Sequence, residues 1–427
     1  MASIFVDSGY CAPFNTPCTP LTHNLLRGKI QRLDASEKRS QGSVHMDAIR
    51  GMAAIVVMLG HSRDLFFQSV NGHTVAMPTL ASGIVAPPHT ARPQITLGNE
   101  AVMIFFVLSG YLVGGSVLRA FQRDNWSWKE YLTKRLTRLW VVLLPALLLT
   151  IVLDNVGLRV FPAPTSIYQG PAGQSEVVPH LANTLTLPII AGNAVFLQNI
   201  LVTTPGTNVA LWSLANEFWY YVIFPLVVLA CWRSSRPGVR VLSALLAVAL
   251  LFLIEWDKAI LFSTWLLGAL LSLLPLRQSE RTSKWLMACL LLLLFPIMVV
   301  IRRLPIDLHL AETCIALYFV LALYVVLNRS QQAGTGLYSR VATVLSDLSY
   351  PLYLVHLPIL VLLCALINRP WHHWSKTPVH FAAMLALDVA ILAAAYLFHL
   401  CFQKHTEVVR LALLGRLQQQ QHVSVET

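Results

Sequence analysis

Long apolar runs separated by short polar and basic stretches repeat along almost the whole chain. Most of these runs approach the ~20 residues that a helix needs to cross the ~30 Å hydrocarbon core of a bilayer. We predict ten such helices, at residues 46–67, 99–118, 138–155, 211–232, 240–256, 259–276, 285–301, 311–328, 348–368 and 379–400. The pattern therefore predicts an all-α, polytopic integral membrane protein with about ten transmembrane helices.

Two parts of this pattern allow other arrangements. The fifth and sixth segments are short and closely joined, so they also fit one hairpin that lies partly in the membrane interface. Residues 181–201 are apolar but contain Asn, Thr, Pro and Gly, which favours a re-entrant or interfacial element, with an eleventh span as the alternative.

The basic residues indicate the orientation in the membrane, because cytoplasmic loops are enriched in Lys and Arg. With the N-terminus inside, the inner segments hold 22 of the 31 Lys and Arg residues and the outer loops hold eight, while Arg50 lies inside the first span. An eleventh span would break this pattern after residue 201. We expect both termini in the cytoplasm, with residues 1–45 as a disordered tail, residues 46–400 as the membrane domain and residues 401–427 as a second tail.

The composition narrows the function classes. Hydrophobic residues make up 56% of the chain and charged residues 12%, whereas soluble domains carry about 25% charged residues. The net charge of +11 comes from short basic clusters between apolar runs, so it points to a lipid bilayer and not to nucleic acid. No metal-ligand pair at helical spacing and no phosphate-binding glycine loop is present, so we expect no metal and no permanently bound cofactor.

The first segment carries two ionisable residues in the run DAIRGMAAIVVMLGH. Arg50 and His61 are eleven residues apart, which places them on one helix face and about 16 Å apart along the axis. Ionisable groups at such depths face the protein interior or a wet cavity, although His61 also fits a simple cap of the outer helix end. An arginine near the inner end can bind phosphate, and an imidazole farther out can act as a base or nucleophile.

The second and third segments combine small, polar and basic residues. In AVMIFFVLSGYLVGG, Gly110 and Gly114 form a small-xxx-small face that is typical of close helix packing, and Ser109 can line a cavity. The run RLTRLW places Arg135 and Arg138 on one side of a helix at the inner face. These arginines fit either a topological anchor or a clamp for an anionic group such as a nucleotide phosphate.

A polar stripe opens the fourth segment, LWSLANEFWYYVIFP. Ser213, Glu217 and Tyr221 follow one another at four-residue spacing, so they share one face of a helix. A carboxylate within a membrane helix is a functional candidate by default, and the alternative is a helix-end group in the interface.

The ninth segment, LSYPLYLVHLPI, carries a second stripe. Ser349, Tyr353 and His356 lie on one helix face, in the inner to middle part of the span. Hydrogen bonds between helices would explain this stripe as well as a reactive site would.

Five of these runs, taken in order, resemble the motifs of the membrane acyltransferase-3 family, and the resemblance covers roughly residues 46–400. It implies transfer of an acyl group, often acetyl, from cytoplasmic acyl-CoA as co-substrate to a hydroxyl of an extracytoplasmic or lipid-linked carbohydrate. Exopolysaccharide, O-antigen and capsule are such acceptors, and the bacterial inner membrane is the implied location. Some members instead acylate macrolides or other small molecules. Many members have an Asp before the double Phe of the second segment, where this chain has Ile104.

The resemblance also implies roles for individual residues. The family pattern of an arginine and a histidine in the first helix falls on Arg50 and His61. Its Arg-x-x-Arg pattern, implicated in acyl-CoA binding, falls on Arg135 and Arg138. A Ser-Leu-x-x-Glu pattern falls on the stripe that contains Glu217. We expect Arg50, His61 and Glu217 to be catalytic, with Glu217 orienting or charge-balancing the imidazole as carboxylates do in catalytic triads.

Other function classes stay open at this point. A transporter or flippase of a lipid-linked glycan would also place polar stripes inside many helices, but it would usually show internal repeats, which we do not detect. A scaffold for polysaccharide export would tolerate substitution of its buried ionisable residues. We favour an O-acyltransferase that associates with the polysaccharide synthesis and export machinery, with the outer loops at 68–98 and 156–210 choosing the acceptor.

Overall fold

The computed structural model describes most of the membrane part of the chain. The described residues are 10–11, 16–17, 41–67, 97–161, 166–168, 181–254, 256–275, 284–304, 308–328 and 336–415. Two short strands, β1 (Tyr10–Cys11) and β2 (Thr16–Pro17), pair antiparallel. The rest of the predicted N-terminal tail up to residue 40, and residues 416–427 of the C-terminal tail, lie outside the described residues.

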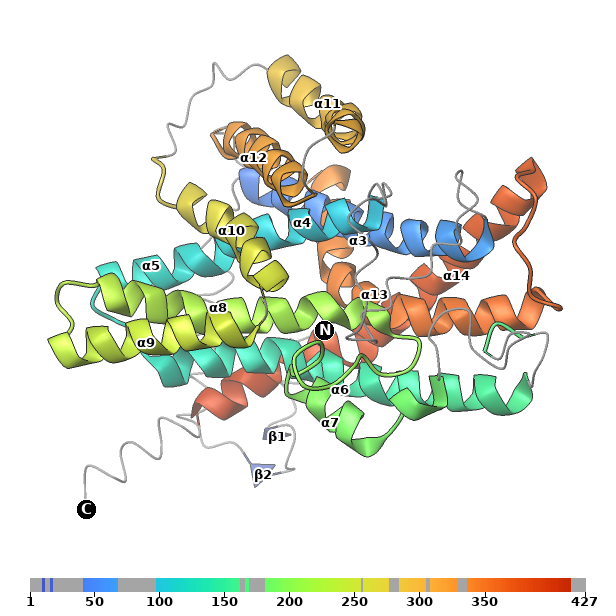
Figure 1. Ribbon diagram of the computed structural model, residues 1–427, viewed down its shortest axis with the longest axis horizontal. Coiled ribbons are helices and arrows are strands. Elements are labelled where there is room, and N and C mark those ends of the chain that lie inside the picture. Colours follow the sequence, from blue (N-terminus) through green and yellow to red (C-terminus); the bar gives the residue numbers. More distant parts are fainter. Residues whose placement is uncertain are drawn as a thin grey trace.

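Each predicted apolar segment overlaps a helical stretch, although α9 ends at Leu253 and α10 at Leu271, before the predicted ends at 256 and 276. The long helices are α3 (Gln41–Phe66), α4 (Leu97–Ser109) continued by the π-helix η1 (Gly110–Gly114) and α5 (Gly115–Gln122), α6 (Trp128–Val160), α8 (Trp212–Cys231), α9 (Pro237–Leu253), α10 (Trp256–Leu271), α11 (Lys284–Arg303), α12 (Leu308–Leu327), α13 (Leu337–Ile367) and α14 (Pro378–Cys401). Short elements are η2 (Leu181–Thr184), α7 (Leu187–Ala194), η3 (Val209–Leu211) and η4 (Gln403–His405). Figure 1 shows α8 beside α9, and α11 beside α12 at one edge of the bundle.

The predicted class, an α-helical polytopic membrane protein, is confirmed. Among the described residues, seven helices are long and apolar enough to cross a membrane, and three shorter apolar helices lie at 237–253, 259–271 and 285–301. Large apolar side chains face outward, such as Phe252 with 82% of its surface exposed. Contact with lipid removes the cost that such surfaces would have in water. The number of ten crossings and the cytoplasmic position of the termini stay predictions.

Residues 181–201 form short elements and not a span. Helix α7 has eight residues, about 12 Å of helix, which is less than half of the hydrocarbon core. The Trp140 indole nitrogen of α6 donates to the Ala194 carbonyl at 2.8 Å, and the Asn193 amide donates to the Thr203 carbonyl at the same distance. These bonds satisfy polar backbone that lipid could not, so the segment packs on α6 as an irregular element.

Among the described elements, helices α3 and α13 make the most extensive contact of the bundle. A Cβ atom added to Gly51 would lie 2.4 Å from the Leu345 Cβ atom, so the two backbones approach as closely as a glycine permits. Arg50 contacts Ser346 near one end, and His61 contacts His356 near the other. The two helices therefore run parallel.

The parallel direction limits the topology. Two helices that cross the membrane in the same direction must be separated by an odd number of crossings. Seven predicted spans lie between α3 and α13, which satisfies this rule, whereas an additional span at 181–201 would violate it.

The glycine contact predicts a stability effect. Gly51→Ala should destabilise the fold by roughly 1–3 kcal/mol, because the added methyl group overlaps both the side chain and the backbone of Leu345. The unfolding temperature of the detergent-solubilised protein measures this. Gly238→Ala is the matched control, since no heavy atom lies within 4 Å of its added Cβ. Equal unfolding temperatures for the two variants would contradict the close α3–α13 contact.

Candidate active site

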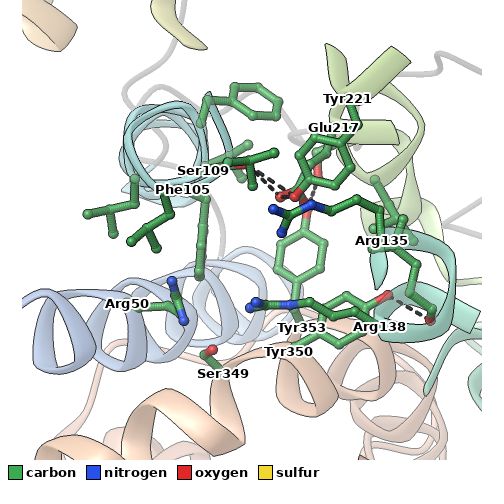
Figure 2. Close-up of a pocket in the computed structure, with 18 residues that line it drawn as sticks. Arg50, Phe105, Ser109, Arg135, Arg138, Glu217, Tyr221, Ser349, Tyr350 and Tyr353 are labelled. Carbon is green, nitrogen blue, oxygen red and sulfur yellow. Dashed lines mark hydrogen bonds between the residues drawn. The ribbon is translucent and has the colours of Figure 1, made fainter. Parts of the chain in front are cut away.

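Most of the predicted site residues line one cavity of about 110 Å³ within the bundle. It is enclosed by α3, α4, η1, α6, α8 and α13, which lie far apart in the sequence. The predicted residues on its walls are Arg50, Ser109, Arg135, Arg138, Ser213, Glu217, Tyr221, Ser349 and Tyr353. Figure 2 labels all of these except Ser213, and shows Arg50, Arg135 and Glu217 around the space between the helices.

Close packing of η1 against α10 places Ser109 at this cavity. A Cβ atom on Gly110 would lie 1.9 Å from the Trp265 carbonyl oxygen, and one on Gly114 would lie 2.6 Å from the Ala269 Cβ atom. The predicted small-residue face is therefore a packing surface. The Trp265 indole nitrogen donates to Ser109 Oγ at 3.2 Å. This bond connects the tightly packed helix pair to the polar wall of the cavity.

Glu217 is held by two hydroxyl groups. Ser109 Oγ donates to Glu217 Oε1 at 2.9 Å, and the Tyr221 hydroxyl donates to the same oxygen. The Tyr131 hydroxyl of α6 donates to the Tyr221 carbonyl at 2.9 Å. The carboxylate thus has partners from two helices, and its position is set by hydrogen bonds that a low-dielectric environment strengthens.

Three arginines give the cavity a positive character (Figure 2). Arg135 donates to Ser116 Oγ at 2.9 Å, and its guanidinium carbon lies 5.4 Å from the centre of the Tyr131 ring. Arg138 lies one turn farther along α6, and Arg50 approaches from α3. Among the described residues of the cavity wall, Glu217 is the one carboxylate that opposes these three cations. A cavity of this charge attracts an anionic ligand.

The inner end of the α3–α13 contact holds Arg50 in place. Arg50 Nη1 donates to Ser346 Oγ at 3.4 Å, and Ser346 Oγ donates to Asp47 Oδ1 at 2.8 Å. The guanidinium group is therefore anchored on one side, and Arg50 lines the cavity on the other. This arrangement leaves part of the arginine available to a ligand.

Tyr353 forms a second polar contact on the cavity wall. Its hydroxyl donates to the Ala210 carbonyl at 2.8 Å, so the Ser213 hydroxyl must be the donor in the 2.6 Å contact between Ser213 and Tyr353. Ser349 Oγ, in contrast, donates to the Ser346 carbonyl of its own helix at 2.7 Å. The predicted stripe on α13 therefore divides: Tyr353 binds across helices, whereas Ser349 is satisfied locally.

His61 and His356 lie beyond this cavity and bind each other. His61 Nδ1 is 2.8 Å from His356 Nε2, and the two ring planes differ by 6°. A nitrogen–nitrogen distance of 2.8 Å is too short for stacked ring faces, so the rings share an in-plane hydrogen bond. The Tyr353 and His356 ring centres are 6.1 Å apart, which connects the histidine pair to the outer end of the cavity.

The hydrogen bonds determine which nitrogens of the pair carry protons. His356 Nδ1 lies 2.9 Å from the Leu352 carbonyl and 3.0 Å from the Tyr353 carbonyl. Carbonyl oxygens only accept, so Nδ1 of His356 carries its proton and Nε2 of the neutral ring accepts. His61 Nδ1 must then donate to His356 Nε2. The lone pair of His61 is consequently on Nε2, in the tautomer suited to a general base or a nucleophile.

This geometry corrects one expectation. We expected Glu217 to orient the His61 imidazole, but Glu217 binds Ser109 and Tyr221. In the described part of the chain, the side chain that hydrogen-bonds His61 is that of His356. An interhelical histidine therefore takes the place that we had predicted for the carboxylate.

Comparison with known proteins gives the family. The family model of the acyltransferase-3 domain, described as an acyltransferase domain, matches residues 44–399. The chain belongs to the acyltransferase-3 family. The resemblance inferred from the five sequence runs is thereby confirmed.

Two curated proteins are similar to parts of this acyltransferase-3 protein. An O-acetyl transferase of Shigella phage Sf6 is 25% identical over 177 residues, which cover 39% of this chain and 45% of the phage protein. An uncharacterised protein of Haemophilus influenzae is 29% identical over 139 residues, covering 31% of this chain and 50% of that protein. The chain thus spans about half the length of the curated relatives that it matches. No solved structure matches the chain.

Sequence reasoning missed two buried carboxylates of this acyltransferase-3 protein. Asp388 of α14 accepts from Ser62 Oγ at 2.5 Å, beside His61. Asp154 of α6 accepts from the Thr207 backbone nitrogen at 2.7 Å and from its hydroxyl at 2.8 Å, which anchors the segment before α8. Each is an acidic residue inside an apolar run, and the rule that flagged Glu217 would have found both.

The Tyr353 contacts predict a measurable effect. Tyr353→Phe should lower the unfolding temperature, because the buried Ala210 carbonyl and the Ser213 hydroxyl each lose a partner, at a cost of about 1–3 kcal/mol per unsatisfied group. Tyr396→Phe on α14 is the matched control, because 46% of Tyr396 is exposed on the outer surface. If both substitutions had the same effect, the cross-helix role of Tyr353 would be wrong.

Proposed function

We propose that this protein transfers an acyl group, in the first instance acetyl, from acyl-CoA to a hydroxyl of an extracytoplasmic or lipid-linked carbohydrate. The observation that supports this best is the His61–His356 pair, which leaves His61 Nε2 as a free base beyond a positively charged cavity. Family membership and the name of the phage relative support acyl transfer to oxygen. The acceptor class follows from the family resemblance.

The cavity suits the donor. Arg50, Arg135 and Arg138 would attract the negatively charged acyl-CoA, and the amide-rich pantetheine arm would lie along the hydroxyls of Ser109 and Tyr353. Arg50 and His61 are about 16 Å apart along the helix axis. An extended arm that enters past the arginines would thus carry the thioester towards His61.

The chemistry then requires one base. His61 Nε2 takes the proton of the acceptor hydroxyl while the oxygen attacks the thioester carbonyl. The tetrahedral intermediate breaks its carbon–sulfur bond, the new ester remains on the acceptor, and the thiolate of CoA takes the proton from His61. His356 Nε2 accepts the hydrogen bond of His61 Nδ1 throughout and stabilises the imidazolium that forms between the two steps.

A two-step route uses the same nitrogen. His61 Nε2 would attack the thioester, release CoA and hold the acyl group until the acceptor hydroxyl arrives. The routes differ in one respect: only the second forms an acyl-enzyme from acyl-CoA without acceptor. Mass analysis of the quenched protein after incubation with radiolabelled acetyl-CoA alone distinguishes them.

We propose the bacterial inner membrane as the location, with association to polysaccharide synthesis and export machinery. Acceptor choice would be made by the outer segments at 68–98 and 156–210. Most of the first segment and parts of the second lie outside the described residues.

The function predicts a loss of glycan esters. His61→Ala should remove the base-labile O-acyl groups from the host's surface glycans, because the proposed base is lost. Proton NMR before and after mild alkali measures these esters in cells with the intact gene, a deletion or His61→Ala. Unchanged esters in the deletion would overturn the proposed acceptor, and esters lost in the deletion but kept in His61→Ala would overturn the proposed base.

His356 is predicted to be a positioning residue. His356→Leu should lower the transfer rate by about 10²- to 10⁴-fold, because His61 loses the acceptor that selects its tautomer. His356→Gln should recover part of this loss, since its carboxamide oxygen can accept the same hydrogen bond. Transfer assays with purified protein, at matched unfolding temperatures, make the comparison. Equal rates for Gln and Leu would contradict the tautomer role.

A further inference from the structure

A second cavity, of about 350 Å³, lies where α5 ends and α6 begins. In the predicted topology this is the cytoplasmic face of the membrane. Its walls include Ser116, Arg119, Arg123, Trp126, Lys134 and Arg135. Arg135 of this wall belongs to the Arg-x-x-Arg motif, whereas neither the family match nor the sequence motifs assign a role to Arg119, Arg123 or Trp126.

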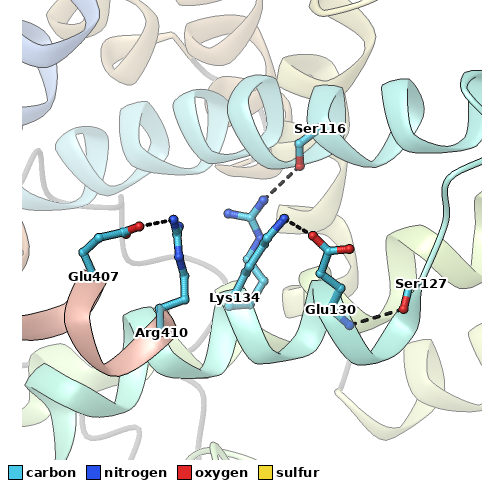
Figure 3. A network of polar contacts seen from close by, with 7 residues as sticks. Ser116, Ser127, Glu130, Lys134, Glu407 and Arg410 are labelled. Atoms are coloured by element: carbon cyan, nitrogen blue, oxygen red, sulfur yellow. Dashed lines mark hydrogen bonds and ion pairs between the residues drawn. The ribbon is translucent and has the colours of Figure 1, made fainter. Parts of the chain in front are cut away.

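The cavity has an excess of positive charge. Arg119 lies in the last turn of α5 and Arg123 directly follows the helix, and both line the cavity. Neither forms an ion pair with a residue that the structure describes. Lys134, in contrast, pairs with Glu130 across one turn of α6, as Figure 3 shows. The two arginines therefore offer planar, bidentate donors that suit phosphate.

An aromatic side chain forms another part of the wall. The Trp126 ring stacks on Phe121 at 4.7 Å between ring centres and meets Trp128 edge-on at 5.2 Å, so its plane is fixed. Its indole nitrogen is buried and has no hydrogen-bond acceptor within the described part of the chain. A fixed indole beside unpaired arginines combines a surface for a flat ring with donors for phosphates.

Arg135 lies between the two cavities. It lines both of them, and its guanidinium group donates to Ser116 Oγ of α5. A ligand whose charged end occupies the α5–α6 cavity would have to pass Arg135 to reach the cavity that holds Ser109 and Glu217. Acyl-CoA has this form, with a phosphorylated nucleotide joined to a long, narrow arm.

We propose that the cavity between α5 and α6 binds the phosphorylated adenosine end of the acyl donor, with Arg119 and Arg123 on its phosphates and Trp126 against its base. The identity of the donor rests on the proposed function. The competing ligand for such a cavity is an anionic lipid headgroup, which shares the phosphate but lacks the flat base and the arm.

Binding of coenzyme A and of adenosine 3′,5′-bisphosphate to the full chain in zwitterionic nanodiscs tests the proposal. The double variant Arg119→Gln/Arg123→Gln should weaken both affinities by about tenfold or more, the size of one lost charge-assisted contact. Arg233→Gln/Arg236→Gln removes the same charge from the loop before α9, outside the cavity, and should change them less than twofold. Equal affinities for the two double variants would overturn the proposal. Displacement of the nucleotide by phosphatidylglycerol, with no effect of Trp126→Ala, would assign the cavity to lipid.

Truncated donors separate this proposal from the proposed function. The ratio of kcat/KM for acetyl-CoA to that for S-acetyl-pantetheine should fall by about tenfold or more in the Arg119→Gln/Arg123→Gln variant. An unchanged ratio with active protein would overturn the nucleotide site and leave acyl transfer intact. Tight coenzyme A binding that depends on the two arginines, without acyl transfer to any acceptor, would keep the site and overturn the proposed function.

Discussion

Helix α3 crosses α13 at Gly51, where a side chain would overlap Leu345. This contact brings together residues that lie about 295 positions apart in the sequence. The Arg50–Ser346 contact and the His61–His356 contact are separated by eleven residues on α3 and by ten on α13. Since both helices rise about 1.5 Å per residue, the two contacts form together and in register. A bulkier residue at the crossing would disturb the arginine contact and the histidine contact at once.

The membrane makes the polar contacts between helices more informative than they would be in water. A polar group in hydrocarbon without a partner costs several kcal/mol, so most such groups find one. Ser109 and Tyr221 bind Glu217, Ser213 binds Tyr353, and Ser62 binds Asp388. The cations of the cavity are different, because three arginines face one carboxylate. Among the described residues, the cavity wall has no second carboxylate to balance the arginines. The uncompensated positive charge is a physical reason to expect an anionic ligand there.

The fold could be predicted well from the sequence because the required length of apolar helix is a strong constraint. All ten predicted segments overlap helices. α6 and α13 extend beyond their apolar runs, whereas α9 and α10 end before the predicted ends of theirs. The π-helix at Gly110–Gly114 has no comparable sequence signal. It packs closely against Trp265 of α10, a contact that periodicity within one helix does not report.

Only part of the candidate site could be predicted, because the spacing within one helix does not report how that helix packs against others. Spacing within a helix shows which residues share a face, so Arg50 with His61 and Tyr353 with His356 were identifiable. Spacing does not show which faces meet. The partner of His61 was assigned to Glu217 on the model of a catalytic triad, whereas the parallel packing of α3 and α13 gives that place to His356.

The packing of the helices places the parts of the site in one order along the bundle. Arg135 stands between the α5–α6 cavity and the helix-lined cavity, and Tyr353 stands between the helix-lined cavity and the histidine pair. His61 is partly exposed at the far end, with its basic nitrogen not used by any described residue. A donor held by its phosphates at one end and an acceptor that approaches the imidazole from the other would then meet without a large rearrangement of the helices. Fixed geometry of this kind lowers a barrier because the cost of orienting both reactants is met by binding.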